Sequence, residues 1–366
     1  MTIQISREQL LHPLSQVIGV VERRQTLPIL STVLFEQENG QLLLTGTDLE
    51  IELKSRVAIE QLDEEKFTVP GRKLIEICRS LPEQANVEIS HKNQQVLLKS
   101  GKSQFKLQGL PPEDYPAIED EVAALECTVS TDVMRYLIQH ASYAMAQQDV
   151  RYYLNGMLWE FQANQLTTVA IDGHRMAYAQ HSLGEQQLAL AKVIIPRKGV
   201  AELSRLLSDI GSELAIKITK NHIQVVGDSL TFTSKLIDGN YPDYRLVIPK
   251  NQANLLIRKK KYLQQALVRA SVLSNEKFKG ISFELSPGHL TLIATNTEQE
   301  QAIETLDVDY DGDPLAIGFN VSYLLETINA ITGENIKFGF SGAGGSVLIE
   351  DVDDDKIVHV IMPMRI

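Results

Sequence analysis

The chain has 366 residues and a formal net charge of −12, with ordinary fractions of hydrophobic and charged side chains. Its length favours two or three domains, and the lack of a long uninterrupted apolar run excludes a transmembrane helix. Two cysteines exclude a disulfide framework and the first residues lack the pattern of a secretion signal, so we expect a cytoplasmic protein.

The first third of the chain predicts a helix, a hairpin, a second helix and an edge strand, in that order. Residues 6–24 have apolar side chains at helical spacing, and Ser6 and Gln9 stand at capping-box spacing. Residues 32–50 alternate as two strands joined by an Asn-Gly turn. Helical spacing returns over 71–81, and residues 97–108 alternate as an exposed edge strand.

The same order of elements returns twice further along the chain. Residues 32–50 align without gaps to 156–174 and to 280–298, at a period of 124 residues. We therefore expect an α+β protein made of three repeated domains, each with two helices packed on antiparallel sheets. The expected domains are 1–125, 126–252 and 253–366, with further helices at 130–148, 197–209, 258–273 and 320–333.

Three polar residues stand almost side by side in the middle repeat: Asp172, His174 and Arg175. Asp172 recurs as Asp48 and Asn296, which predicts a turn residue that bonds the local backbone. His174 and Arg175 do not recur, so any role they have belongs to the middle repeat alone. No serine or cysteine nucleophile is placed beside them, and the histidines lack metal-ligand spacing, so we expect no catalytic residue, metal or cofactor. A phosphoester-processing enzyme using His174 and Arg175 is one alternative.

The predicted helices are basic although the chain is acidic. Arg72, Arg197 and the run 258–261 lie near helix N-termini, where a cation costs about 0.3–1 kcal/mol. A helix start with basic side chains can bind phosphate. If the helices face inward and the sheets outward, the inner wall suits duplex DNA, bound through its phosphates without sequence preference. The plainer interpretation is solvated side-chain tips, and an acidic peptide-binding scaffold without DNA is the second alternative.

Several long segments, among them "TLPILSTVLFE", "QDVRYYLNGM", "TVAIDGHR", "FTSKLIDGNYPDYRLVIPK" and "VIMPMR", closely resemble the bacterial DNA polymerase III beta subunit family, the sliding clamps. The likeness runs from end to end. It implies three similar domains per chain, two chains closed head to tail into a ring around duplex DNA, and a homodimer without enzymatic activity. The implied partners are DNA polymerases and a clamp loader that opens the ring with ATP.

The resemblance also implies a pocket between the second and third domains that receives short linear motifs of partner proteins. An apolar tail with two methionines, such as "VIMPMRI", suits a surface that accepts several partners. Leu246 and Gly344 stand where relatives carry bulkier or basic groups, so the preference of the pocket stays open. The implied pocket residues are Leu154, Ile171, Gly173, His174, Arg175, Met176, Pro242, Val247, Asn320, Tyr323, Ser346, Val360, Met362, Pro363, Met364 and Arg365.

Two further sets of residues are expected at interfaces. The resemblance implies DNA contacts by Arg24, Gln148, Arg151, Tyr152 and Tyr153, and the helix charges add Arg72, Arg197 and Arg205. Opposite charge on two edges predicts a head-to-tail subunit contact, which closes into a ring only when the rotation allows it. One edge holds Phe105 and Leu107 with Lys99, Lys102 and Lys106 around them; the other holds Val272, Leu273, Glu298, Glu300 and Glu304.

Overall fold

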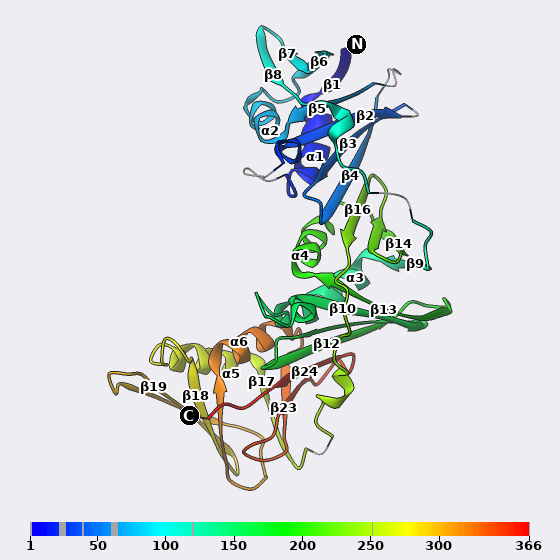
Figure 1. Cartoon of the computed structure of the whole chain (residues 1–366). Coiled ribbons are helices and arrows are strands. Elements are labelled where there is room, and N and C mark those ends of the chain that lie inside the picture. Colours follow the sequence, from blue (N-terminus) through cyan, green and yellow to red (C-terminus); the bar gives the residue numbers. More distant parts are fainter. Residues whose placement is uncertain are drawn as a thin grey trace. The chain divides into compact units, whose positions relative to one another are not determined.

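The computed structural model describes residues 2–21, 27–38, 40–59, 65–118, 121–250 and 252–365 (Figure 1). The chain forms two compact units. The first contains Met1–Asp132 and Ala201–Leu236, and the second contains Val133–Val200 and Ile237–Ile366. None of the helices in the described ranges is long and apolar enough to cross a membrane.

The first unit contains two antiparallel sheets. A four-stranded sheet has the order β1-β6-β7-β8, and an eight-stranded sheet has the order β5-β2-β3-β4-β16-β15-β14-β9. Helices α1 (Arg7–Val17) and α2 (Gly71–Ser80) pack side by side in this unit (Figure 1). The strands are β1 (Thr2–Ser6), β2 (Thr32–Glu38), β3 (Gln41–Thr47), β4 (Ile51–Ala58), β5 (Lys66–Pro70), β6 (Asn86–Lys92), β7 (Gln95–Ser100), β8 (Ser103–Gln108), β9 (Leu125–Ser130), β14 (Glu213–Ile218), β15 (His222–Val226) and β16 (Leu230–Lys235).

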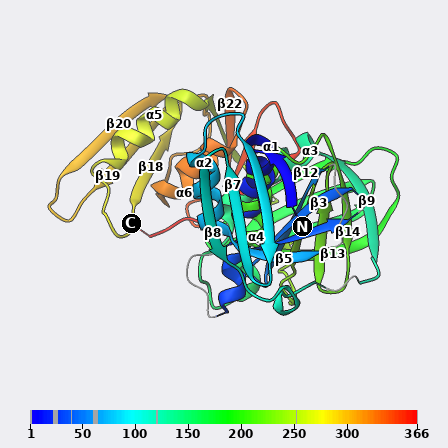
Figure 2. The ribbon, with the colours of Figure 1, turned by 90° about the horizontal axis from the view of Figure 1, so that it is seen from above.

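The second unit also contains an eight-stranded and a four-stranded antiparallel sheet, ordered β13-β10-β11-β12-β24-β23-β22-β17 and β20-β19-β18-β21. Helix α5 (Lys260–Ser271) packs on β19 and β20 of the smaller sheet and also contacts α6 (Val321–Ala330) (Figure 2). The strands are β10 (Gly156–Ala163), β11 (Gln165–Ile171), β12 (Arg175–Ser182), β13 (Leu188–Pro196), β17 (Asn254–Lys259), β18 (Gly280–Ser286), β19 (His289–Thr295), β20 (Gln301–Asp307), β21 (Leu315–Asn320), β22 (Asn335–Phe340), β23 (Val347–Asp351) and β24 (Ile357–Ile361).

The strand orders repeat three times along the chain, which confirms the predicted repeat. One four-stranded run appears as β5-β2-β3-β4, β13-β10-β11-β12 and β21-β18-β19-β20. The other appears as β1-β6-β7-β8, β9-β14-β15-β16 and β17-β22-β23-β24. Each third of the chain also supplies two helices, with α3 (Thr131–Ala141) and α4 (Arg197–Leu206) in the middle third.

Each eight-stranded sheet joins strands from two neighbouring thirds of the chain. In what we call the first seam, β4 pairs with β16 and places Leu53 opposite Phe232. In the second seam, β12 pairs with β24 and places Ala177 opposite His359. Because main-chain hydrogen bonds cross both seams, the described thirds are not separated by open linkers. β8 and β20 are the repeat equivalents of the strands that pair at the two seams, and both are edges of four-stranded sheets.

The alternating strands bury large apolar side chains, as the sequence pattern requires. Trp159, the single tryptophan, is fully buried in β10. In the last third, Phe283 packs edge-on against Phe319 with ring centroids 5.0 Å apart. Burying one such side chain contributes about 1.5–3 kcal/mol. Burial of these rings stabilises the sheets on which the residues of the candidate site lie.

Several predicted boundaries differ from the structure. The helix expected over 130–148 ends at Ala141 and is followed by a short 3-10 turn over Ser142–Ala144. The helix expected over 6–24 ends at Val17, with Pro13 inside it. The helix expected from residue 258 begins at Lys260, because the preceding residues continue β17 and its pairing with β22 through Lys259. The single edge strand expected over 97–108 is a hairpin of β7 and β8, and its reversal uses Gly101 at φ +56°.

Candidate functional site

The polar turn of the middle repeat is a structural turn, as its recurrence predicts. Asp172 Oδ1 accepts from the main-chain amides of His174 at 2.8 Å and Arg175 at 3.0 Å. Asp48 accepts from the amides two and three residues further on, at 2.9 and 2.7 Å. Asn296 accepts from the amide four residues on, at 2.9 Å. The short side chain closes all three turns, so Asp172 serves the fold rather than any chemistry.

Arg175 is buried at the second seam, and its side chain bonds residues of the middle and last thirds of the chain. Its guanidinium lies 3.0 Å from Asp172 and 2.5 Å from Glu326 on α6, and it donates to the Tyr143 carbonyl at 3.0 Å. The same group lies over the Tyr323 ring, 4.5 Å from its centroid. A guanidinium with four partners and little solvent is not available to hold a substrate anion.

His174, the residue before Arg175, is exposed at the surface. Its ring stacks against Tyr323 with centroids 6.0 Å apart, and its carbonyl accepts from the Met362 amide at 2.8 Å. The tail then continues to β21, where the Met364 amide donates to the Gly318 carbonyl at 2.9 Å. A hollow of about 350 Å³ opens here, lined by Met145, Ala146, Gln147, Asp149, Asp172, His174, Arg175 and Tyr323.

Beneath this hollow lies an apolar cluster, which we call the docking cluster. Its buried members are Ala146, Leu154, Leu158, Val169, Ile171, Met176, Ile194, Tyr244, Leu348 and Val360. Among the half-buried side chains packed against it are Tyr153, Tyr241 and Val247. Five predicted pocket residues (Leu154, Ile171, Met176, Val247 and Val360) are therefore brought together in this cluster or against it. Pro242 lines an adjoining hollow of about 380 Å³ on the loop that ends at Arg245.

The remaining predicted pocket residues differ in backbone conformation, hydrogen bonding and exposure. Gly173 takes a left-handed φ of +90° in the turn. Asn320 caps α6 through its side chain, which accepts from the Ser322 amide at 2.9 Å. Met362 is 47% exposed, so half of its side chain is free to meet a partner. Ser346, Pro363 and Met364 are half-buried, Arg365 and Gly344 are exposed, and Leu246 is 79% exposed.

Sequence reasoning missed two residues that hold the site together, Tyr143 and Glu326. Tyr143 supplies the carbonyl for Arg175, and its hydroxyl lies 2.9 Å from His359 Nδ1. Glu326 pairs with Arg175 from 151 positions further along the chain. No local spacing signals either contact, but Glu326 stands in register with Glu76 and Glu202 in the repeats.

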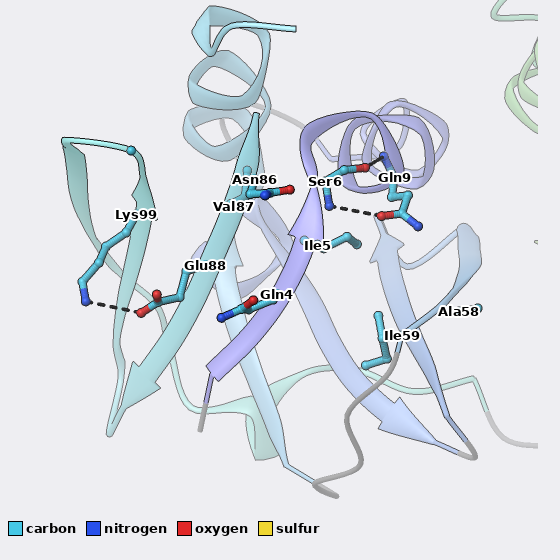
Figure 3. A pocket seen from close by; sticks show the side chains of 11 residues that line it. Gln4, Ile5, Ser6, Gln9, Ala58, Ile59, Asn86, Val87, Glu88 and Lys99 are labelled. Carbon is cyan, nitrogen blue, oxygen red and sulfur yellow. Dashed lines mark hydrogen bonds and ion pairs between the residues drawn. The ribbon is translucent and has the colours of Figure 1, made fainter. Parts of the chain in front are cut away.

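The hollow at His174 combines apolar side chains with ionisable ones. Its lining includes no serine, threonine or cysteine, and the neighbouring guanidinium is already paired. A larger hollow of about 470 Å³ lies in the first unit, and its lining includes Lys99 of the predicted subunit edge but none of the predicted pocket or DNA-contact residues (Figure 3). There Ser6 and Gln9 bond each other as a capping box, and Lys99 pairs with Glu88 at 3.3 Å. Across the described residues no group of three or more His, Cys, Asp or Glu side chains is placed to hold a metal ion.

The predicted DNA contacts fall into two groups. Gln148, Arg151 and Tyr152 form an exposed loop, in which the Arg151 guanidinium bonds Asp149 at 2.8 and 3.0 Å. This pairing lowers the pKa of Asp149 to about 2. Tyr152 is 57% exposed, whereas Tyr153 turns inward against the docking cluster. The loop therefore presents one aromatic ring and one arginine to the solvent.

Two of the cations near helix starts, Arg72 and Arg197, are already bonded, which the sequence did not predict. Arg72 donates to the Val21 carbonyl at 3.2 Å, and Arg197 donates to the Met145 carbonyl at 2.8 Å. Both carbonyls stand four residues after the last residue of the first helix of the same third. Arg205 instead bonds across the first seam. Arg24 lies outside the described residues. Contacts with DNA by all of these side chains stay predictions.

The predicted subunit edges have the expected strands and charges. Leu107 is buried and Phe105 half-buried on β8, while Lys102 and Lys106 are exposed. On the other edge Val272 is 77% exposed and Leu273 half-buried. Glu298 and Glu300 are exposed next to β20, and Glu304 pairs with Arg269 at 2.6 Å.

Comparison with known proteins identifies the family. The models of the DNA polymerase III beta subunit N-terminal, central and C-terminal domains match residues 1–119, 128–243 and 245–365. The chain belongs to the DNA polymerase III beta subunit family. Beta sliding clamps of Pseudomonas putida and Escherichia coli are each 46% identical to this chain over the full length of both chains.

Solved structures agree with this assignment. The DnaN sliding clamp of Pseudomonas aeruginosa bound to griselimycin superimposes with a TM-score of 0.97 at 46% identity, over the whole of both chains. The Caulobacter crescentus pol III beta structure gives a TM-score of 0.96 at 34% identity, again over both whole chains. The family and the repeated α+β clamp fold predicted from the sequence are thereby confirmed.

Proposed function

We propose that two copies of this chain close head to tail into a ring that encircles duplex DNA without sequence preference. The ring slides on DNA in the cytoplasm and tethers DNA polymerases and a clamp loader, which gives processivity without a cofactor or catalytic residue of its own. Membership of the sliding-clamp family supports this function. Each third of the chain, 1–125, 126–252 and 253–366, is one clamp domain.

The single observation that carries the ring is the repetition of the two seams. Each seam pairs the last strand of one four-stranded run with the last strand of the other run, in β4·β16 and β12·β24. In the third pair of this kind, β20 and β8 do not pair with each other, and each is a sheet edge among the described residues. An unpaired edge invites a strand from another chain. A second copy supplies it, and two such contacts close a ring of six domains.

The repeat also gives the register of the third seam. Phe232 and His359, opposite Leu53 and Ala177 in the two seams, are the repeat equivalents of Phe105. Moving Leu53 forward by two repeat periods of 124 residues, and Ala177 by one, leads in both cases to Gln301. We therefore place Phe105 of one copy opposite Gln301 of the other.

This register matches opposite charges. It sets Lys106 opposite Glu300 and Lys102 opposite Glu304, and all but Glu304 are exposed in the isolated chain. Complementary charge favours the correct partner and speeds association. The exposed Val272 and its neighbour Leu273 lie beside the same edge and supply apolar area. Replacing both with alanine should yield monomers.

The pocket for partner motifs is the hollow at His174 together with the docking cluster and the tail from Met362 to Arg365. An apolar floor, a stacked His174–Tyr323 rim and an exposed methionine favour a short, largely apolar peptide. The exposed Leu246 adds apolar surface beside this floor.

Retention on DNA of different topology tests the proposal. After loading, the protein should stay on a closed circle when the salt concentration is raised, and it should leave the same DNA once the circle is cut. A protein held only by phosphates leaves circle and linear DNA alike as salt rises. Equal loss from both forms would favour a scaffold that does not encircle DNA. Turnover of a phosphoester that disappears in His174→Ala would favour the enzyme alternative.

A further inference from the structure

A glutamate occupies the sixth position of the second helix in every third of the chain. The helices begin at Gly71, Arg197 and Val321, and the glutamates are Glu76, Glu202 and Glu326. Nothing in helix formation requires an acidic side chain there. Its recurrence at one position indicates a task that the three seams share.

In the first seam this glutamate holds an arginine against the opposing helix. Glu202 lies 2.6 Å from the Arg205 guanidinium, and Arg205 donates to the Gln16 carbonyl near the end of α1 at 2.7 Å. The contact is close, since a Cβ on Gly19 would lie 2.2 Å from Glu202 Oε1. The guanidinium therefore bridges a carboxylate and a carbonyl at the end of a helix.

The second seam reaches the same result with another arginine. Glu326 lies 2.5 Å from Arg175, and Arg175 donates to the Tyr143 carbonyl just after α3 at 3.0 Å. Tyr143 is the repeat equivalent of Gly19. In both seams a guanidinium thus links the sixth-position glutamate to the C-terminal end of the opposing first helix, where the helix dipole is negative.

The third glutamate has no such link among the described residues. Glu76 and Arg79 are both exposed, and neither side chain has a partner in the part of the chain that the structure describes. They have the same spacing as Glu202 and Arg205. The equivalent of Gln16 in the last third is Arg269, near the C-terminal end of α5.

We propose that Arg79, held by Glu76, donates to the Arg269 carbonyl at the end of α5 in a second copy of the chain. This inference rests on the proposed ring and adds a helix-to-helix contact to its strand pairing. Val272 is the repeat equivalent of Gly19. In the first seam Glu202 lies so close to Gly19 that a Cβ there would meet its carboxylate. The Val272 side chain therefore prevents the Glu76 carboxylate from lying equally close in the third seam. The guanidinium, rather than the carboxylate, therefore makes the contact between subunits.

The test is the dissociation constant of the dimer, measured by sedimentation over a dilution series. Arg79→Ala should raise it about tenfold, because a charge-assisted hydrogen bond is lost. Glu76→Gln should also raise it, and the double variant should be no weaker than Arg79→Ala alone, because the two side chains act as one unit. Lys220→Ala, which removes an exposed charge between β14 and β15, is the matched control and should leave the value unchanged.

The outcomes separate this inference from the ring itself. A dimeric wild type whose dissociation constant stays within twofold in Arg79→Ala overturns the inference and leaves the ring standing. A wild type that is monomeric at every concentration overturns the ring. Thermal unfolding of each variant by circular dichroism checks that Arg79→Ala has kept its fold, and Arg79→Lys, which keeps the charge but loses the planar fork, should fall between wild type and alanine.

Discussion

The main-chain amide of Met362 donates to the carbonyl of His174 over 2.8 Å, so the last residues of the chain are tied to the polar turn of the middle repeat. This bond joins two segments that the proposed pocket needs at the same time. The turn supplies the stacked ring, and the tail supplies the exposed methionine.

Removing residues 362–366 should abolish binding of a short partner peptide and leave the dimer intact. The deletion takes away one wall of the pocket without touching β8 or β20. Fluorescence anisotropy of a labelled polymerase-derived peptide measures the first effect, and sedimentation measures the second. Met362→Ala keeps both main-chain bonds of the tail and should weaken binding less than the deletion. Unaltered affinity in the deletion would remove the tail from the pocket.

Replacing Arg175 with alanine should lower the free energy of unfolding by about 3 kcal/mol, since it leaves Asp172 and Glu326 facing each other without a counter-charge. Arg175→Lys should recover only part of this loss, because an ammonium cannot reach all three partners at once. Denaturant unfolding at pH 7.5 gives the values. Arg365→Ala, which changes an exposed residue, is the control. If Arg175→Ala lowers the unfolding free energy no more than the control does, the bonds of Arg175 do not stabilise the second seam.

The second seam should weaken in acid because of His359. This side chain is fully buried, and burial, with a contribution from nearby His140, lowers its pKa from the ordinary 6.5 to about 3. The folded protein therefore holds it neutral while the unfolded chain protonates it below about pH 6.5. Stability that is present above pH 6.5 is lost as the pH falls toward 3, by about 2 kcal/mol at pH 5.

The comparison of two variants isolates this effect. His359→Gln removes the titrating group, so its unfolding free energy should change less between pH 7.5 and pH 5 than that of the wild type. His289→Gln changes a histidine whose side chain is 60% exposed and should keep the wild-type dependence. Identical pH dependence in all three proteins would exclude His359 as the source.

Reversing one charge at the proposed third seam should break the dimer, and reversing its partner should restore it. Lys106→Glu places like charges opposite each other if the repeat-derived register is correct, and Glu300→Lys in the same chain recreates an opposite pair. Mass photometry at nanomolar concentration reports the dimer fraction. Lys92→Glu, in the same sheet but away from β8, is the control. Failure of the double variant to recover would refute the register.

Much of the fold could be predicted because the chain repeats itself. A gap-free match over 32–50, 156–174 and 280–298 identified three hairpins, and the recurring Asp48, Asp172 and Asn296 identified their turns. Local rules were enough there, since a turn and its two strands are formed by neighbouring residues.

The seams could not be predicted in this way. Pairing of β12 with β24 joins residues about 180 positions apart. The alternation of apolar side chains predicts that a strand forms, but it does not predict which other strand pairs with its edge. For the same reason the sequence did not predict that Arg175, which lines the hollow at His174, also pairs with Glu326. The sequence also did not predict the carbonyl partners of Arg72 and Arg197, because only the packed structure brings those carbonyls near them.

Trp159 gives the protein an optical probe at one place. It is the only tryptophan, it is buried in β10, and β10 pairs with β11, the strand that leads into the His174 turn. Emission excited at the red edge of the indole band therefore comes from the middle of the chain alone. A partner peptide without tryptophan, titrated into the unlabelled protein, can be followed through this one residue, while rearrangements confined to the first or last third would pass without a spectral trace.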